Sequence, residues 1–179
     1  PSLDCLDIKT FKNYEYKHSI SVAVLAVLLG VKAGLNVEQI DNLAVAGLLH
    51  DIGKFDIKKR VLNSKHIYGD KQMDEMKKHP MYSYETLQEY SMISSVSRNS
   101  ILFHHENLDG SGYYGLPGEK LGTFPRILRI VDTYDALTST RKHRAAFSPA
   151  YAFQNLADNS GSQFDTDLVR DFIFLMAMY

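Results

Sequence analysis

Apolar residues recur at three- and four-residue steps along most of the 179-residue chain, the spacing of amphipathic α-helices. No stretch alternates convincingly at the period of two that indicates a β-strand. The chain is therefore predicted to be all-α, as a single domain that spans residues 1–179. Helices are predicted at 10–32, from 36 or 37, from 41 to about 50, from 71, from 79 or 80, and at 91–106, 124–137, 149–157 and 166–179.

The same spacing assigns an inner face to the first helix. We expect His18 to lie one turn before this face, and Gly34 to close the helix. The apolar run at 20–31 is too short to span a bilayer and lacks the flanks of a signal peptide, so we expect a soluble protein without membrane contact. The inner face is predicted to consist of Ile20, Val24, Val27, Leu28 and Val31.

A chemically distinctive stretch ends the helix predicted near residue 50. His50 and Asp51 are expected at its inner end, behind a buried face made of Val45, Leu48, Leu49 and Ile52. Gly53 is expected to end the helix in a left-handed conformation, which would bring Lys54 back over the site. This arrangement suits a metal with a phosphate beside it, although by itself a His-Asp pair near a helix end is more often structural.

Composition narrows the possible functions. A formal net charge of -1 gives no global electrostatic reason to expect binding to DNA or to a membrane. The single cysteine, Cys5, excludes an internal disulfide and a thiolate zinc site, which fits a reducing compartment. Because the chain opens on Pro1, we expect it to be a piece of a longer regulatory protein.

Seven residues carry the candidate chemistry. Asp132 is the most diagnostic, because an aspartate inside an apolar helix is costly to bury without a cation or several donors. Neighbouring side chains on a helix diverge by about 100°, so the adjacent pairs suit two ions better than one. Nitrogen-rich, thiolate-free ligation favours iron or manganese, with nickel or zinc as alternatives. The residues are His18, His50, Asp51, His79, His104, His105 and Asp132.

The motifs resemble the HD-GYP family of bacterial phosphohydrolases, which hydrolyse cyclic dinucleotides and chiefly cyclic di-GMP. The resemblance extends from the His18 helix to 161–165 and 168–169, with separate motifs in register. It implies a bundle of about seven helices with a metal site at its centre, in the bacterial cytoplasm. The motifs are His50-Asp51-Ile52-Gly53-Lys54, His79-Pro80, His104-His105-Glu106, Asp109-Gly110-Ser111-Gly112-Tyr113 and Asp132-Thr133-Tyr134-Asp135-Ala136-Leu137.

The resemblance also implies a role for each residue. All seven candidate residues match the family's metal ligands, with Asp51 as the carboxylate that bridges two divalent ions. Asp51 and Lys54 are the expected catalytic residues, and Lys54 also contacts the scissile phosphate. Further substrate contacts are expected from Asp135, Arg141 and Arg144. Cyclic di-GMP would be opened to pGpG through a metal-bridging hydroxide, and whether hydrolysis continues to GMP stays open.

Several positions depart from the family pattern. Some members place a glutamate four residues before the first histidine and hold a third ion, but Tyr14 occupies that position here and Glu15 is expected to point elsewhere. The signature Gly-Tyr-Pro reads Gly112-Tyr113-Tyr114, without its proline. Lys58 replaces a usual proline and Ser83 a common glycine. None of these positions is an expected ligand, so two ions and intact chemistry are predicted, with altered substrate access or regulation.

Other functions stay open at this point. The substrate could be another cyclic dinucleotide, such as cyclic GMP-AMP, or a different nucleotide. From another class, the domain could be a non-hydrolysing module that senses a nucleotide or docks a diguanylate cyclase or an upstream regulatory domain. A purely structural bundle is a third alternative. The intact set of seven costly residues favours an enzyme over both.

Overall fold

The structure is a computed structural model that describes residues 13–57, 69–141 and 144–178. Within these residues the prediction of an all-α fold is confirmed, because the only β-type pairings are isolated bridges. The α-helices are α2 (Asn13–Lys32), α3 (Val37–Leu49), α5 (Asp70–Met76), α6 (His79–Gln88), α7 (Ser95–Leu102), α8 (Thr123–Thr138), α9 (Pro149–Asp158) and α10 (Thr166–Met176), with 3-10 helices η1 (Ile52–Phe55) and η2 (Gly118–Lys120).

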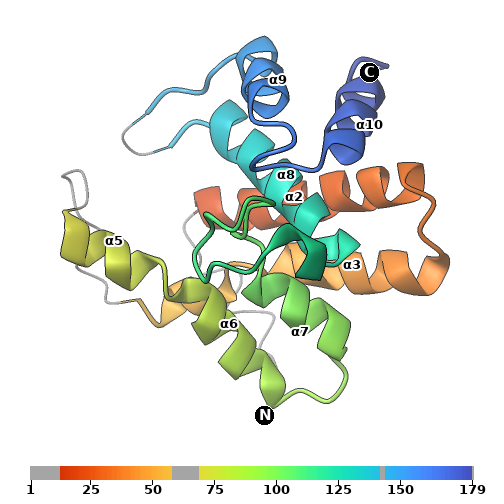
Figure 1. Cartoon of the computed structure of the whole chain (residues 1–179). Coiled ribbons are helices and arrows are strands. Elements are labelled where there is room, and N and C mark those ends of the chain that lie inside the picture. The colour runs from red at the N-terminus through yellow and green to blue at the C-terminus, as the bar shows by residue number, and fades with distance from the viewer. Residues whose placement is uncertain (1–12, 58–68, 142–143, 179) are drawn as a thin grey trace.

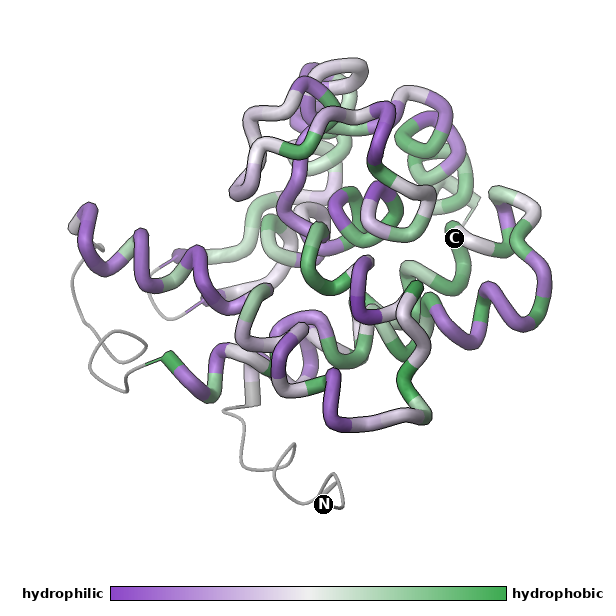
Figure 2. Tube along the Cα trace, turned by 60° about the horizontal axis from the view of Figure 1, so that its bottom comes forward, coloured by the Kyte–Doolittle hydropathy of each residue, from purple (hydrophilic) through white to green (hydrophobic). Residues whose placement is uncertain are grey.

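The consecutive helices α2 and α3 pack against each other, and α8 packs across α2 (Figure 1). On one side of this centre α7 packs on α3 and α6 packs on η1, and on the other α9 and α10 pack on α8. Apolar segments gather where helices meet, whereas α5 is mostly hydrophilic (Figure 2) and contains no buried residue. No helix in the described part of the chain is long and apolar enough to cross a membrane.

Two predicted boundaries are wrong. Residues 37–49 form one helix instead of two, because Asn36 caps α3: its side chain accepts from the amide of Gln39, whose side chain accepts from the amide of Asn36. The helix predicted at 91–106 is only α7, which begins after the cap residue Ser94 and ends at Leu102. Gly34 closes α2 as predicted, with a φ of 79°.

The predicted inner face of α2 is also wrong. Ile20, Val24 and Val31 are 39%, 53% and 62% exposed, and Leu48 on α3 is 39% exposed. The buried face of α2 instead consists of His18, Val22, Ala26 and Leu29. Because α2 is apolar on nearly all sides, the spacing of its apolar residues could not distinguish the inner face from the outer one. This face carries His18 into the interior.

Candidate metal centre

The seven candidate residues come from separate segments that meet at the centre of the bundle. His18 belongs to α2, and His50 and Asp51 lie between α3 and η1. His79 is the first residue of α6, His104 and His105 follow α7, and Asp132 lies inside α8. All are buried except His105, which is partly buried. The structure therefore brings together every residue that was predicted to bind metal.

Three of the histidines share one hydrogen-bond pattern. Each donates from Nδ1 to the backbone carbonyl three residues earlier: His50 to Gly47 at 2.8 Å, His79 to Met76 at 2.8 Å, and His104 to Ile101 at 2.6 Å. A carbonyl can only accept, so Nδ1 carries a proton in each ring, and Nε2 is the nitrogen left to bind a metal. Metal-binding histidines are oriented by this kind of contact, in which the other nitrogen binds an acceptor.

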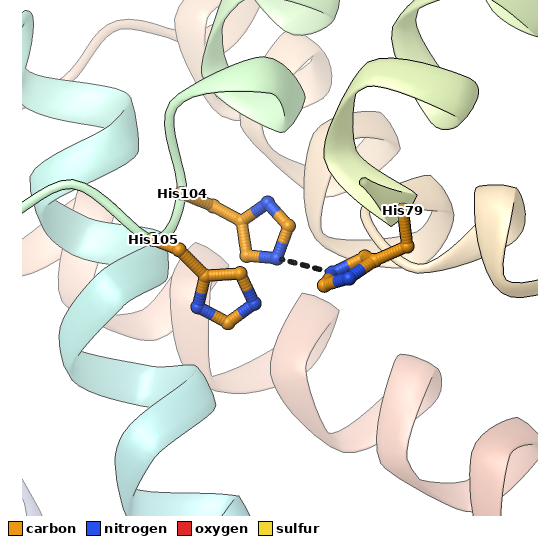
Figure 3. A group of neighbouring side chains, drawn as sticks. All are labelled: His79, His104 and His105. Atoms are coloured by element: carbon orange, nitrogen blue, oxygen red, sulfur yellow. Dashed lines mark hydrogen bonds between the residues drawn. The ribbon is translucent and has the colours of Figure 1, made fainter. Parts of the chain in front are cut away.

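The free nitrogens point at other acceptors. His79 Nε2 lies 3.4 Å from His104 Nε2, the contact that Figure 3 marks, and 3.1 Å from Asp51 Oδ1. Asp51 Oδ1 is buried without a hydrogen-bond donor. When the two rings are neutral, with Nδ1 protonated, these three atoms are all acceptors, an arrangement that a cation would stabilise.

Two groups of three residues have ligand atoms within 4.8 Å of one another: His18, His50 and Asp51, and His79, His104 and His105. Asp51 lies between them, with Oδ2 at 3.3 Å from His50 Nε2 and Oδ1 facing His79. Asp132 also faces both, with Oδ1 at 3.1 Å from His18 Nε2 and Oδ2 at 3.9 Å from His105 Nδ1. Glu15 belongs to neither group.

The expectation that adjacent residues diverge by about 100° and so serve different ions does not apply to His104 and His105. Both lie in one group, with ring centroids 4.0 Å apart. The reason is that α7 ends at Leu102, so these residues occupy a turn in which side chains need not diverge by 100°. Figure 3 shows the three rings of this group converging from α6 and from the segment after α7.

Gly53 lies in η1, and its predicted left-handed conformation is wrong. Glycine is required there by a close approach to α6, because a Cβ would lie 2.2 Å from the carbonyl oxygen of His79 and 2.4 Å from the amide of Ser83. The Ser83 hydroxyl accepts from the Gly53 amide at 2.8 Å and donates to the His50 carbonyl at 2.9 Å. Ser83 thereby joins the His50-Asp51 segment to the helix that begins with His79.

The two central carboxylates are held in their charged form. Burial opposes ionisation of Asp51, but His50 and the Lys54 ammonium outweigh it and hold the pKa of Asp51 well below its usual range. Burial likewise opposes ionisation of Asp132, and its contact with His18 outweighs burial and keeps the pKa of Asp132 low. Charged carboxylates are the form that binds a cation.

The histidines divide into two electrostatic classes. Burial lowers the pKa of His105 to about 3, and burial together with neighbouring histidines holds the pKa of His104 well below its usual range. Burial also lowers the pKa of His18, but contacts with Asp132 and Asp135 outweigh it and raise that pKa to about 9. His104 and His105 are thus neutral and able to donate a lone pair at neutral pH.

The expected substrate contacts lie in different surroundings. The Lys54 ammonium contacts Asp51 Oδ2 and is partly exposed. Asp135 is buried, and its Oδ2 accepts from His18 Nδ1 at 2.6 Å, so it orients a candidate ligand. Arg141 is exposed and lies over the Tyr14 ring, 5.4 Å from its centroid. Arg144 donates to the Ala136 carbonyl at the end of α8, which favours a structural role; a substrate contact for it stays a prediction.

The glycine-rich loop is fixed by Glu106, a residue to which the sequence assigned no role. Its buried carboxylate accepts from the amides of Tyr114 and Leu116, both at 2.7 Å. The loop approaches so closely that a Cβ on Gly112 would lie 2.5 Å from Glu106 Cα. These contacts place the Tyr113 ring 4.5 Å from the His105 ring. The acid that directly follows two buried histidines was the available signal for this role.

Replacing Tyr114 by proline should destabilise the protein, even though proline is the family's usual residue. Proline has no N–H, so Glu106 would lose one of its two donors, at a cost of about 2 kcal/mol for a hydrogen bond to a charged group. Denaturant unfolding measures the change. Tyr114→Ala is the matched control, because it removes the ring and keeps the amide; equal losses in the two variants would contradict the role of the amide.

Lys58 and the basic stretch 58–60 lie outside the described residues, as does Cys5. Tyr14, at the position of the third-metal glutamate, stacks on the ring of His18 with centroids 5.7 Å apart and planes 8° apart. An aromatic side chain at this position supplies no carboxylate, in keeping with the prediction of two ions.

Known proteins resemble this chain in sequence and in fold. A family model described as "HD domain" matches residues 6–168. A cyclic di-GMP phosphodiesterase of Pseudomonas aeruginosa is 31% identical over 178 residues, which covers 99% of this chain and 43% of the relative. A 3'3'-cGAMP-specific phosphodiesterase of Vibrio cholerae is 35% identical over 139 residues, which covers 75% of this chain and 31% of the relative.

Among solved structures, an HDG"Y"P protein from Bdellovibrio bacteriovorus superimposes with a TM-score of 0.74 at 19% identity, covering 89% of this chain and 51% of that protein. At this identity the match shows a shared fold. The chain spans less than half the length of the two curated relatives.

Proposed function

Because the chain belongs to the HD domain family, as its motifs indicated, we propose that it is a metal-dependent phosphodiesterase that opens cyclic di-GMP to pGpG, and then yields GMP. The observation that carries this proposal is the contact of His79 Nε2 with two further lone-pair atoms, on His104 and Asp51, at 3.4 and 3.1 Å. A site built for structure alone would place donors opposite these acceptors.

The donor set fits two divalent ions. One would be held by His18, His50, Asp51 and Asp132, and the other by the group around His79 together with Asp51. Imidazole and carboxylate ligands without thiolate favour iron or manganese over nickel or zinc. Two such ions would supply a hydroxide nucleophile at neutral pH and would offset the negative charge on phosphate oxygens.

The side chains around the ions would orient the substrate. Lys54 would exchange its contact with Asp51 for a phosphate oxygen, which becomes more negative in the transition state. Arg141 would offer a second cation at the rim. Buried carbonyls behind His50, His79 and His104 hold the ring protons away from the reacting centre.

Replacing Asp135 by asparagine should weaken metal binding about 10- to 100-fold, because His18 would lose the charged acceptor that orients its ring. Competition with a chromophoric chelator measures the affinity. KM for the nucleotide should change much less once metal is saturating. An unchanged metal affinity with a raised KM would show that Asp135 contacts substrate instead.

The proposed function is tested by turnover. Purified protein is incubated with cyclic di-GMP under reducing conditions, with and without ferrous or manganous ion, and products are separated by chromatography. We expect pGpG to form only with metal, and metal analysis to find about two ions per chain. Absence of product with both metals would refute the enzyme.

Cyclic GMP-AMP is the second candidate substrate, because relatives in Vibrio cholerae are named for that specificity. Parallel reactions with equal concentrations of both nucleotides compare their kcat/KM values. A non-hydrolysing sensor is less consistent with seven residues converging on one centre, and a metal-free protein that still binds nucleotide would favour it. A cytoplasmic location and a diguanylate cyclase or regulatory partner domain are further parts of the proposal.

A further inference from the structure

Arg129 lies beside the candidate metal centre, and in the described part of the chain its side chain donates hydrogen bonds to neutral acceptors alone. Arginine has five N–H donors, so one N–H on each Nη remains available after three contacts. No carboxylate oxygen within the described ranges lies within 4.0 Å of this guanidinium. The three contacts are Nε to Asn107 Oδ1 at 2.9 Å, Nη1 to Thr133 Oγ1 at 2.8 Å, and Nη2 to Gln163 Oε1 at 3.4 Å.

Arg126, one turn earlier on the same helix, makes a useful contrast. Its guanidinium pairs with Asp165 at 2.9 Å and donates to two backbone carbonyls. Arg126 is therefore paired with a carboxylate inside the protein, whereas Arg129, among the described residues, has no direct ion pair and interacts with Asp132 and Glu106 only at longer range. A partly buried guanidinium cannot escape the cost of burial by losing its proton, so an anion from outside would stabilise it.

Arg129 lines a cavity of about 320 Å³ that continues from the metal centre. His105 and Asp132 contribute to its wall, and Tyr113 and Arg141 line it as well. The Phe164 ring lies 5.2 Å from the Arg129 guanidinium. Together with the three neutral contacts, this ring holds the guanidinium in one orientation without neutralising it. The cavity thus presents two arginines next to the reacting centre.

The ligand that this cavity requires follows from the proposed function, on which the inference rests. A cyclic dinucleotide carries two phosphodiesters, and only one of them can lie at Lys54 and the ions. We propose that the cavity binds the second phosphate, the one that is not cleaved in that turnover, with Arg129 as its principal contact and Arg141 as a second. The planar guanidinium fork matches two phosphate oxygens.

Binding is measured by calorimetry on metal-loaded protein, with a hydrolysis-resistant bis-phosphorothioate analogue of cyclic di-GMP. Arg129→Gln should raise Kd about 10- to 100-fold, as expected for loss of charge-assisted hydrogen bonds. The Kd of Arg129→Lys should lie between those of the wild type and Arg129→Gln, because lysine keeps the charge but lacks the planar guanidinium. The exposed Arg170, paired with Asp167, provides the control variant Arg170→Gln. Metal content is determined for each protein, and equal Kd values at equal metal content would overturn the proposal.

Two further comparisons separate this inference from its alternatives. Bis(4-nitrophenyl) phosphate has one phosphodiester and no second phosphate. The fall in kcat/KM caused by Arg129→Gln should therefore be at least about tenfold smaller with this substrate than with cyclic di-GMP. A loss confined to guanine nucleotides, with binding of cyclic di-AMP unaffected, would assign Arg129 to the base and overturn the phosphate contact. Absence of turnover refutes the proposed enzyme, while the Kd comparison still decides the role of Arg129.

Discussion

Replacing Asp51 by asparagine is expected to lower turnover of cyclic di-GMP about 10³-fold, because each ion supplies several kcal/mol of charge stabilisation. The two oxygens of Asp51 face different groups, Oδ2 toward His50 at 3.3 Å and Oδ1 toward His79 at 3.1 Å. Asparagine has the same shape but offers one oxygen and no charge, so it cannot join two ions. Metal analysis should accordingly find fewer ions per chain than in the wild type.

Asp56 offers a matched control for this experiment. It lies five residues further along the chain, directly after η1, and is exposed. Asp56→Asn removes the same charge from the same segment and should leave metal content and turnover close to those of the wild type. If Asp51→Asn retained full metal content and turnover, the bridging role of Asp51 would be refuted.

Replacing Gly53 by alanine is expected to lower the free energy of unfolding by about 3 kcal/mol, at the upper end of the cost of overpacking. The added methyl group would meet backbone atoms of α6, at 2.2 Å from the His79 oxygen and 2.4 Å from the Ser83 nitrogen. Backbone cannot rotate away as a side chain can, so α6 must move. Because His79 begins α6, metal affinity should fall together with stability.

Gly69→Ala is the control for the Gly53 variant. Among the described residues, no heavy atom lies within 4 Å of a Cβ at Gly69, and its φ of -73° suits any residue. Its free energy of unfolding should therefore stay within about 0.5 kcal/mol of the wild type. Denaturant titration of the metal-free proteins measures both variants. A Gly53→Ala protein as stable as the control would show that η1 and α6 do not approach each other so closely in solution.

The ends of helices could be predicted from the sequence, but the buried face of α2 could not. Strong local signals, such as Gly34 after α2 and the proline that follows His79, placed helix ends within a few residues, because caps depend on neighbouring residues alone. The prediction of the inner face of α2 was wrong because both faces of this helix are apolar. Burial of Val22 instead of Val24 depends on packing against α3, the next helix, and against α8, which lies far along the chain.

The candidate ligands were identifiable from sequence because buried histidines and carboxylates are costly and their motifs are local and ordered. How these ligands divide between the two groups could not be identified from the sequence, since the position of His104 beside His105 depends on where α7 ends. Arg129 was missed altogether. Its neutral partners Asn107 and Gln163 lie 22 and 34 residues away, and no local pattern connects them.

The sequence by itself determined the all-α class, the positions of most helices and the choice of seven candidate metal-binding residues, because helical periodicity and residue chemistry are local properties. Only the tertiary structure decided that Asp51 faces both groups of histidines, that Gly53 must be glycine because α6 packs against it, and that Arg129 hydrogen-bonds to neutral acceptors. Each of these depends on distances between segments that meet only when the helices pack.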